Sequence, residues 1–267
     1  MKTKKLFIWV SIAAMVMATM SSCMRVKIGD KDWSLINLSG HKNDTPSQVT
    51  EAGKDIAMQA FDELSLYGPF NVILEQGEGH KVRVDGTVDQ LAAMTIYVKN
   101  GTLYIDMKED MFDSDKFFKG MKVYVTATTI KGIELAGSGM ITAPAALAVA
   151  DMTMNVAGSG DITLAQLTCQ DLSIEIAGSG DVTTGPIQAK KVRSQIAGSG
   201  DIDIAALTCT TLHNEIAGSG DMTFNNLNVE TVNSQIAGSG DIILRGKAGT
   251  HKEDIAGSGT VDTSRLQ

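Results

Sequence analysis

The stretch AGSGDITLAQLTCQDLSIEIAGSGDVTTGPIQAKKVRSQIAGSGD, residues 157–201, repeats one glycine-rich phrase at a fixed interval. Ala-Gly-Ser-Gly occurs seven times in the chain, beginning at Ala136, Ala157, Ala177, Ala197, Ala217, Ala237 and Ala256. The intervals between successive copies are 21, 20, 20, 20, 20 and 19 residues. A regular period of about 20 residues is typical of a solenoid, in which each repeat packs on its neighbours. The sequence therefore predicts a protein of stacked repeats.

Within one repeat, the apolar side chains indicate strands and exclude a helix. In residues 157–176 they lie two residues apart, and the phase changes after each short run: Ile162, Leu164, Leu167, Cys169, Leu172, Ile174 and Ile176. A spacing of two is the period of a strand, whose alternate side chains share one face. We therefore predict an all-β fold, a single-stranded parallel β-helix (solenoid) with coils of about 20 residues. Three short strands are expected per coil, and the crossover rule makes the helix right-handed.

Gly-Ser-Gly is then expected at a corner of each coil. Glycine permits the positive φ that tight corners require, and the preceding alanine is small enough to lie inside the bend. We expect such a φ at Gly200, for example. A phosphate-binding loop needs a helix after its glycines, whereas a strand is expected after every copy of this phrase. The glycines therefore do not predict nucleotide binding.

The N-terminus has the layout of a secretory signal peptide. Three lysines in the first five residues precede an apolar run, Leu6–Ala18, that is too short for a membrane span, and small residues lead to Cys23. The phrase Met-Ser-Ser-Cys resembles a bacterial lipobox, in which the cysteine is lipidated and begins the mature protein. An ordinary secretory signal with an incidental cysteine is the alternative. We expect lipidation at Cys23.

The charge of the mature chain limits its partners. Removing residues 1–22 takes three lysines and no acidic residue from a chain of net charge −8, which leaves −11. An acidic surface disfavours nucleic acid and broad electrostatic contact with anionic membranes. We therefore expect membrane contact through the N-terminal lipid alone, with a glycan or an envelope protein as the partner.

The chain divides into four segments by composition. Residues 1–22 are the expected signal peptide, and residues 23–54 are polar and aperiodic, as in a flexible tether that follows the lipidated cysteine. Residues 55–131 read as irregular β coils or hairpins, with Tyr-Gly-Pro, Asp-Gly and Asn-Gly turns, and residues 132–267 as the regular β-helix. The acidic segment 108–118 interrupts the irregular part. It is expected to be a solvated loop, with a binding site as the alternative.

A known family shares these phrases. FDELSLYGPFNVILEQGEGHKVRVDG, MTIYVKNGTLYIDM and KVYVTATTIKGIELAGSG, followed by the repeated AGSGD, resemble the bacterial envelope family called putative auto-transporter adhesin, head GIN domain. The resemblance covers about residues 55–267. It implies a right-handed β-helix and an adhesin-like lipoprotein of Bacteroides-type organisms, anchored in the outer membrane and facing the periplasm or the surface. Residues 24–27, Met-Arg-Val-Lys, depart from the acidic run that often accompanies surface display.

Aspartate follows the corner phrase in five successive repeats, at Asp161, Asp181, Asp201, Asp221 and Asp241. Strands stack about 4.8 Å apart, so neighbouring carboxylates repel by roughly 1 kcal/mol even in water. Hydrogen bonds from corner amides, or from the serine hydroxyl two residues earlier, would offset this repulsion. A row of divalent cations would do the same, since calcium takes oxygen ligands. We expect the structural arrangement, with no metal and no other cofactor.

Two cysteines, Cys169 and Cys209, hold the same repeat position two repeats apart. Their backbones are then about 9.6 Å apart, beyond the reach of a disulfide. We expect both to be small buried hydrophobic residues.

The absence of insertions in the repeats decides between two functional classes. Enzymes built on β-helices carry acids and bases in long loops that break the repeat, and residues 157–236 contain no insertion. We therefore predict a non-catalytic adhesin or binding scaffold that presents repetitive faces to a polymer or protein partner. The alternative is a carbohydrate-active enzyme, a polysaccharide lyase or hydrolase, for which 108–118 is the eligible loop.

Overall fold

The protein's structure is a computed structural model that describes residues 25–28, 31–34, 52–108 and 114–267. The chain divides into two units, residues 1–45 and 46–267, and each is described by itself. In the first unit, β1 (Arg25–Ile28) and β2 (Lys31–Ser34) form an antiparallel pair. Both strands belong to the segment that the sequence predicts as a tether.

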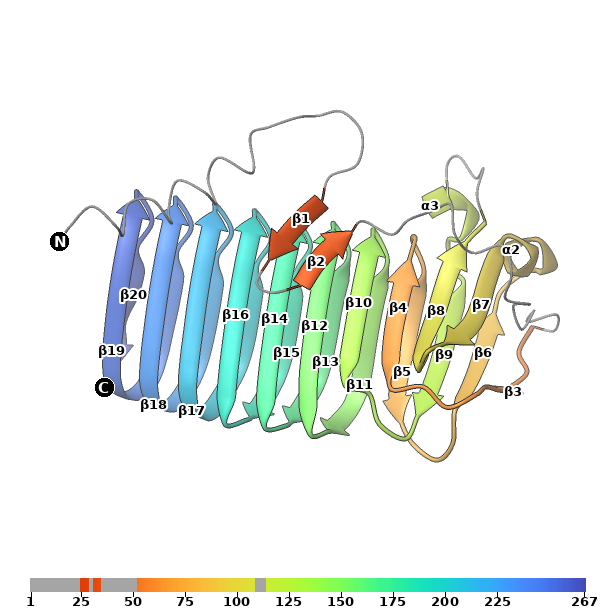
Figure 1. Cartoon of the computed structure of the whole chain (residues 1–267), viewed down its shortest axis with the longest axis horizontal. Helices are drawn as coiled ribbons and strands as arrows, with labels where there is room; N and C mark the ends of the chain where they lie inside the picture. The colour runs from red at the N-terminus through yellow and green to blue at the C-terminus, as the bar shows by residue number, and fades with distance from the viewer. Residues whose placement is uncertain (1–24, 29–30, 35–51, 109–113) are drawn as a thin grey trace. The chain divides into compact units, whose positions relative to one another are not determined.

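The second unit is a parallel β-solenoid (Figure 1). Its strands in chain order are β3 (Ile56–Ala57), β4 (Glu63–Tyr67), β5 (Asn71–Gln76), β6 (Lys81–Asp85), β7 (Met94–Lys99), β8 (Thr102–Met107), β9 (Lys122–Ala127), β10 (Gly132–Gly137), β11 (Met140–Ala148), β12 (Asp151–Gly158), β13 (Asp161–Thr168), β14 (Asp171–Gly178), β15 (Val182–Gln188), β16 (Lys191–Gly198), β17 (Ile202–Gly218), β18 (Met222–Gly238), β19 (Ile242–Gly257) and β20 (Val261–Leu266). From β12 to the first part of β19, in-register partners in neighbouring coils lie 20 residues apart along the chain, as Asp171 and Lys191 do. The all-β solenoid predicted from the repeat is confirmed.

The hydrogen-bonded ladder between neighbouring coils continues through most of their corners. Residues 161–178 form two strands, β13 and β14, whereas residues 202–218 of a later coil form the single bent strand β17. The three predicted segments remain visible in the burial pattern, because the alternation of buried and exposed residues shifts phase at 165–166 and at 170–171. The corners therefore bend a nearly continuous ladder and do not interrupt it.

The order of the first coils in space differs from their order in the chain. β4 pairs in parallel with β8 on one side and with β10 on the other, and β5 pairs in the same way with β9 and β11. Antiparallel β7 covers the edge of β8, and antiparallel β6 covers the edge of β9 (Figure 1). The antiparallel strands protect an edge that would otherwise offer free backbone groups to another chain.

Short turns and helices complete this end of the solenoid. The expected Asn-Gly turn joins β7 to β8, with Asn100 and Gly101 at φ 52° and 82°, as a two-residue hairpin turn requires. The helices are α2 (Val88–Ala92) and α3 (Ser114–Phe117), and the Gln90 side chain of α2 donates a hydrogen bond of 2.7 Å to the Phe117 carbonyl. Neither helix is long and apolar enough to cross a membrane, and the structure describes no longer one.

The core consists of inward columns, in which one residue from each coil stacks on its partner in the next. Ile162, Val182, Ile202 and Met222 form one such column, and each is at most 1% exposed. Cys169 and Cys209 are buried and free, as expected. Burial raises the pKa of the Cys169 thiol to about 11 and that of the Cys209 thiol to about 12, so both stay neutral thiols at pH 7.

One inward column changes from apolar to polar along the solenoid. Its members in order are Met154, Ile174, Ser194, Asn214 and Ser234. The three polar members are no more than 1% exposed. The hydroxyls of the two serines and both polar atoms of the Asn214 side chain have no hydrogen-bond partner within the described structure. A polar stripe therefore runs through three coils of an otherwise apolar core.

Replacing Leu207 with alanine tests the register of this core. Leu207 is fully buried, and its inward column consists of Leu147, Leu167, Ile187, Leu207 and Leu227. Loss of its side chain should lower the free energy of unfolding by about 2–5 kcal/mol, through lost burial and a cavity. Denaturant titration measures this change. The matched control, exposed Thr208→Ala, should stay within about 0.5 kcal/mol of the wild type. If the control were the destabilising variant, inward and outward positions would be displaced by one residue.

Candidate functional site

The corner glycines are required for two different reasons. Gly198 has a φ of 145°, and a Cβ there would lie 2.1 Å from the carbonyl oxygen of Gly178 in the preceding coil. Gly200 is not among the glycines with positive φ, so the expectation of a positive φ at this position is wrong. A Cβ at Gly200 would instead lie 2.0 Å from the carbonyl oxygen of Gly180. The second glycine is therefore required by the close approach of two coils.

The aspartate ladder is part of the hydrogen bonding between coils. Each carboxylate accepts, through Oδ1, a hydrogen bond from the backbone N–H at the same position of the next coil. The N···O distances for the amides of Asp181, Asp201, Asp221, Asp241 and Thr260 are 3.1, 2.9, 2.8, 2.8 and 2.8 Å. Before the ladder begins, Met140 offers no carboxylate, and the Asp161 amide donates to the Gly139 carbonyl at 3.0 Å. The carboxylates thus take over an acceptor role that the backbone has in the first coil.

The sequence predicts that hydrogen bonds to the carboxylates offset their mutual repulsion, and the structure agrees with this prediction in part. The donor is a corner amide, as expected, but it belongs to the next coil. Within the described ranges, no group of three or more His, Cys, Asp or Glu side chains is placed to hold a metal ion. The ladder carboxylates therefore have a structural role, since they join neighbouring coils through hydrogen bonds to the backbone.

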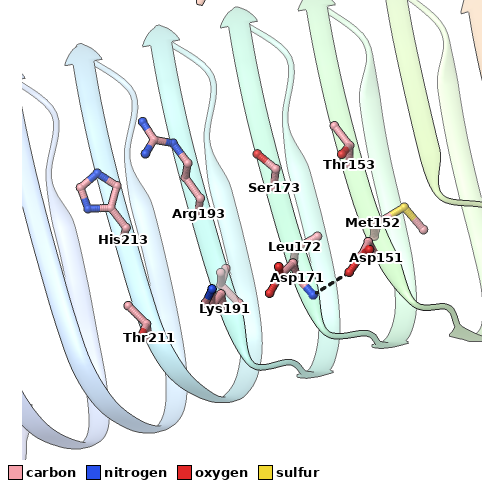
Figure 2. Close-up of a pocket in the computed structure, with 11 residues that line it drawn as sticks. Asp151, Met152, Thr153, Asp171, Leu172, Ser173, Lys191, Arg193, Thr211 and His213 are labelled. Carbon is pink, nitrogen blue, oxygen red and sulfur yellow. Dashed lines mark hydrogen bonds between the residues drawn. The ribbon is translucent and has the colours of Figure 1, made fainter. Parts of the chain in front are cut away.

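A second candidate site lies on the sheet face formed by β12, β14, β16 and the second half of β17. It is a shallow groove of about 360 Å³ (Figure 2). We call it the charged groove and define it by the outward residues Asp151, Thr153, Asp171, Ser173, Lys191, Arg193, Thr211 and His213. Asp151, Asp171, Lys191 and Thr211 stand in register in one column, and Thr153, Ser173, Arg193 and His213 in the next. The short side chains of Thr153 and Ser173 form a depression in the sheet face beside the longer side chains of Arg193 and His213.

Charge changes sign along the charged groove. Asp151 and Asp171 are exposed at one end, and the Asp171 amide donates to Asp151 Oδ1 at 3.3 Å. Lys191 and Arg193 follow on the next coil, and both are exposed. The groove therefore offers carboxylates at one end and cations at the other.

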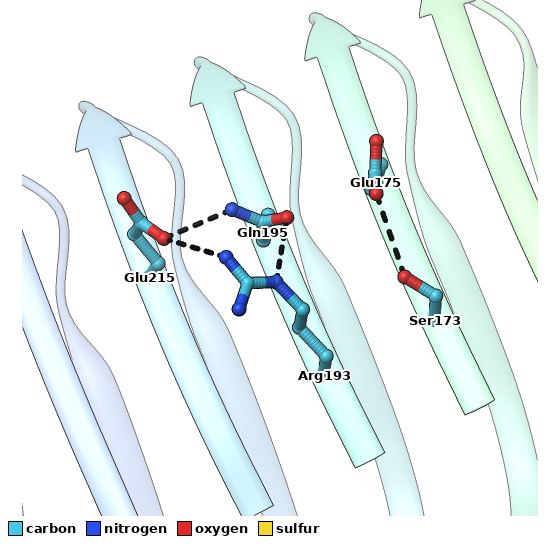
Figure 3. Close-up of polar contacts among 5 residues, drawn as sticks. All are labelled: Ser173, Glu175, Arg193, Gln195 and Glu215. Carbon is cyan, nitrogen blue, oxygen red and sulfur yellow. Dashed lines mark hydrogen bonds and ion pairs between the residues drawn. The ribbon is translucent and has the colours of Figure 1, made fainter. Parts of the chain in front are cut away.

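Arg193 also takes part in a network with the neighbouring outward column (Figure 3). Its Nε donates to Gln195 Oε1 at 2.8 Å, and its Nη2 lies 3.3 Å from Glu215 Oε2. Gln195 Nε2 donates to the same Glu215 oxygen at 2.9 Å. Because Arg193 is paired with Glu215 and Lys191 has no such pair in the described structure, Lys191 is the more available cation of the groove.

The surroundings of His213 favour the neutral form of its imidazole. Burial lowers the pKa of the imidazole below its usual value, and the charge of Arg193 lowers the pKa further, against the opposing effect of Glu215. His213 therefore acts in the groove as a neutral hydrogen-bonding group.

The other predicted positions lie outside the charged groove. Cys23 lies outside the described residues, as do residues 109–113 of the acidic segment. At the described end of that segment, Ser138 donates to Asp115 Oδ1 at 3.2 Å. The aspartate ladder contributes no residue to the groove lining. Sequence reasoning missed the groove because its side chains resemble an ordinary solvated face. The available signal was the succession Asp151, Asp171 and Lys191 at one repeat position.

The regular coils define the class of protein as a parallel β-solenoid. Within that class, the chain belongs to the family described as putative auto-transporter adhesin, head GIN domain. The family's sequence profile matches residues 60–227 and 215–267.

Crystal structures of proteins from Bacteroides fragilis and Parabacteroides distasonis have the same fold. A putative adhesin from Bacteroides fragilis is 24% identical with a TM-score of 0.69, over 78% of this chain and 94% of that one. A putative lipid binding protein from Parabacteroides distasonis is 23% identical with a TM-score of 0.63, over 78% and 92%. A putative adhesin from the same species is 20% identical with a TM-score of 0.65, over 78% and 94%. No curated protein matches the chain.

Asp201 variants and calcium distinguish a structural ladder from a cation site. Asp201→Asn keeps the acceptor for the Asp221 amide and should change the free energy of unfolding by less than about 0.5 kcal/mol, whereas Asp201→Ala removes the acceptor and should cost about 0.5–1.5 kcal/mol. Millimolar calcium or a chelator should leave the melting temperature unchanged, since a ligand stabilises only by binding the folded state. A rise of several degrees with calcium that Asp201→Asn abolishes would instead identify the ladder as a cation site.

Proposed function

We propose that this protein is a non-catalytic, adhesin-like binding scaffold of the cell envelope. The observation that carries the proposal is the uninterrupted register of the outward columns. From Gly158 to Gly238 every coil pairs with the next at a constant offset of 20 residues, with no loop inserted between coils. Such a face presents equally spaced side chains to an extended partner. Membership of the adhesin family and the descriptions of the similar structures support the same role.

The charged groove supports binding more than catalysis. A glycoside hydrolase places two carboxyl groups on opposite sides of the bond that it cleaves. Asp151 and Asp171 stand side by side on one flat face, so both approach a ligand from the same direction.

The proposed location follows from the N-terminal sequence. The signal peptide and the lipobox-like Met-Ser-Ser-Cys support export and lipidation at Cys23, with the solenoid held at the outer membrane by the lipid. The lipid anchor and the partner, a glycan or an envelope protein, are part of this proposal.

Replacing Cys23 with alanine tests the anchor. The variant should move from the membrane fraction to the soluble fraction of the native host, because a lipidated cysteine is the proposed attachment. Immunoblotting of the two fractions measures the shift. Cys169→Ala is the matched control, since it removes a buried thiol and should leave the protein in the membrane fraction. Membrane retention of Cys23→Ala equal to that of the control would contradict the anchor.

A binding screen tests the scaffold function. The fragment 24–267 retains the whole core, whose buried hydrophobic residues lie between Phe61 and Leu244. Immobilised on beads, it should retain a component of envelope extracts or a glycan from an array, and the heat-unfolded fragment is the control. New reducing ends or unsaturated sugars released from polysaccharides would show an enzyme instead. Absence of any retained component would contradict the scaffold function.

A further inference from the structure

The charged groove presents acidic and basic side chains on adjacent coils. Asp171 and Lys191 are in-register neighbours on adjacent coils, and both are exposed. Lys191 nevertheless forms no ion pair with any other described residue, while Arg193, on the same coil, pairs with Glu215. Asp151 adds a second exposed carboxylate to the acidic end. The groove thus keeps opposite charges exposed to a ligand.

The composition of this part of the chain indicates a peptide ligand more than a sugar. Sugar rings present apolar faces that aromatic side chains cover well. The repeats offer none, because the only Phe, Tyr or Trp in residues 140–267 is Phe224, which is fully buried. The four tyrosines of the chain, Tyr67, Tyr97, Tyr104 and Tyr124, all precede the groove in sequence. The groove therefore offers a ligand charged side chains at its two ends and no Phe, Tyr or Trp surface.

The spacing of the coils sets the spacing of charges in the ligand. Adjacent coils are about 4.8 Å apart, so the acidic and basic ends of the groove are separated by about one to two such steps. In an extended peptide, side chains two residues apart lie on the same face at about 6.8 Å, whereas adjacent side chains point in opposite directions. Two residues is therefore the spacing that brings both charges of one peptide onto the groove.

We propose that the charged groove binds an extended peptide segment that carries a basic and an acidic side chain two residues apart. The basic side chain lies over Asp151 and Asp171, and the acidic side chain lies over Lys191. His213 and Ser173 supply neutral hydrogen-bonding groups beside them. This assignment rests on the proposed scaffold function and names the partner as a protein.

Peptides of equal composition test the spacing. Fluorescence anisotropy with fragment 24–267 compares labelled, end-capped SGKSESG, SGKESSG and SGQSQSG at 0.15 M salt. SGKSESG should bind about 1.4-fold to fivefold more tightly than SGKESSG, which keeps one ion pair, and about twofold to 25-fold more tightly than SGQSQSG, which keeps none, because one exposed ion pair is worth a factor of about 1.4 to 5 in Kd. Equal Kd values for SGKSESG and SGKESSG would overturn the proposal.

Groove variants test the location. Lys191→Gln and Asp171→Asn should each weaken SGKSESG binding about twofold to fivefold, and Asp171→Lys should shift the preference to SGESESG. Lys252→Gln, an exposed position three coils beyond Arg193 in the same column, should bind like the wild type. Thermal melting by circular dichroism verifies that each variant is folded. Wild-type affinity in Lys191→Gln and Asp171→Asn, or an equal loss in Lys252→Gln, would refute the location.

Two further results separate this inference from the proposed function. If the groove variants lose binding to chitosan or oligogalacturonate oligomers and none of the peptides binds, the groove is a glycan site and the scaffold function stands. If the groove variants retain a partner from envelope extracts as well as the wild type does, the groove assignment fails alone. Failure of the wild-type fragment to bind any component sinks both.

Discussion

The close contact between backbones at the corners determines the rest of the structure. Gly198 and Gly200 each approach a carbonyl oxygen of the preceding coil so closely that a Cβ would come within about 2 Å of it. Because the same contact recurs in successive coils, it keeps the corners in register, even where one coil is a residue shorter, as between Gly238 and Gly257. Parallel strands then stack without slippage, and every column of side chains follows from this register. The corner glycines thus determine which side chains stack on one another even far from the corner.

Strict register has a consequence for polar residues, since it places each side chain directly against its equivalent in the next coil. At the corner the equivalents are carboxylates, and their repulsion is offset because each accepts the next backbone N–H. In the core, Ser194, Asn214 and Ser234 follow one another in a single column. An isolated polar group against hydrocarbon costs about 1–3 kcal/mol when its hydrogen bonds are lost. Consecutive placement does not satisfy these side chains, because none of their polar atoms has a hydrogen-bond partner within the described structure.

The features that could be predicted from the sequence are those that repeat. The 20-residue period and the two-residue apolar spacing were sufficient for the solenoid, the inward columns and the buried cysteines, because burial of apolar side chains and backbone pairing leave few other solutions. The reversed order of the coils β4–β5 and β8–β9 occurs once and depends on contacts distant in sequence, so no periodic signal reports it. The reason for Gly200 was missed because a steric contact between coils is invisible in one repeat. The groove was missed because its charges alternate with inward residues as any solvated strand does.

Inward and outward columns differ in how freely their residue types can change from coil to coil. This difference favours a binding function for the outward face. Inward and corner positions are limited by packing and by backbone contacts, so the corner glycines recur in every regular coil and most inward columns stay apolar. Outward positions of β12, β14, β16 and β17 meet neither limit, and in one column they hold Asp171, Lys191 and Thr211 in succession. A change at such a position alters surface charge at little cost in stability. The solenoid therefore keeps a constant frame while single exposed residues on successive coils change the charge of its outward face.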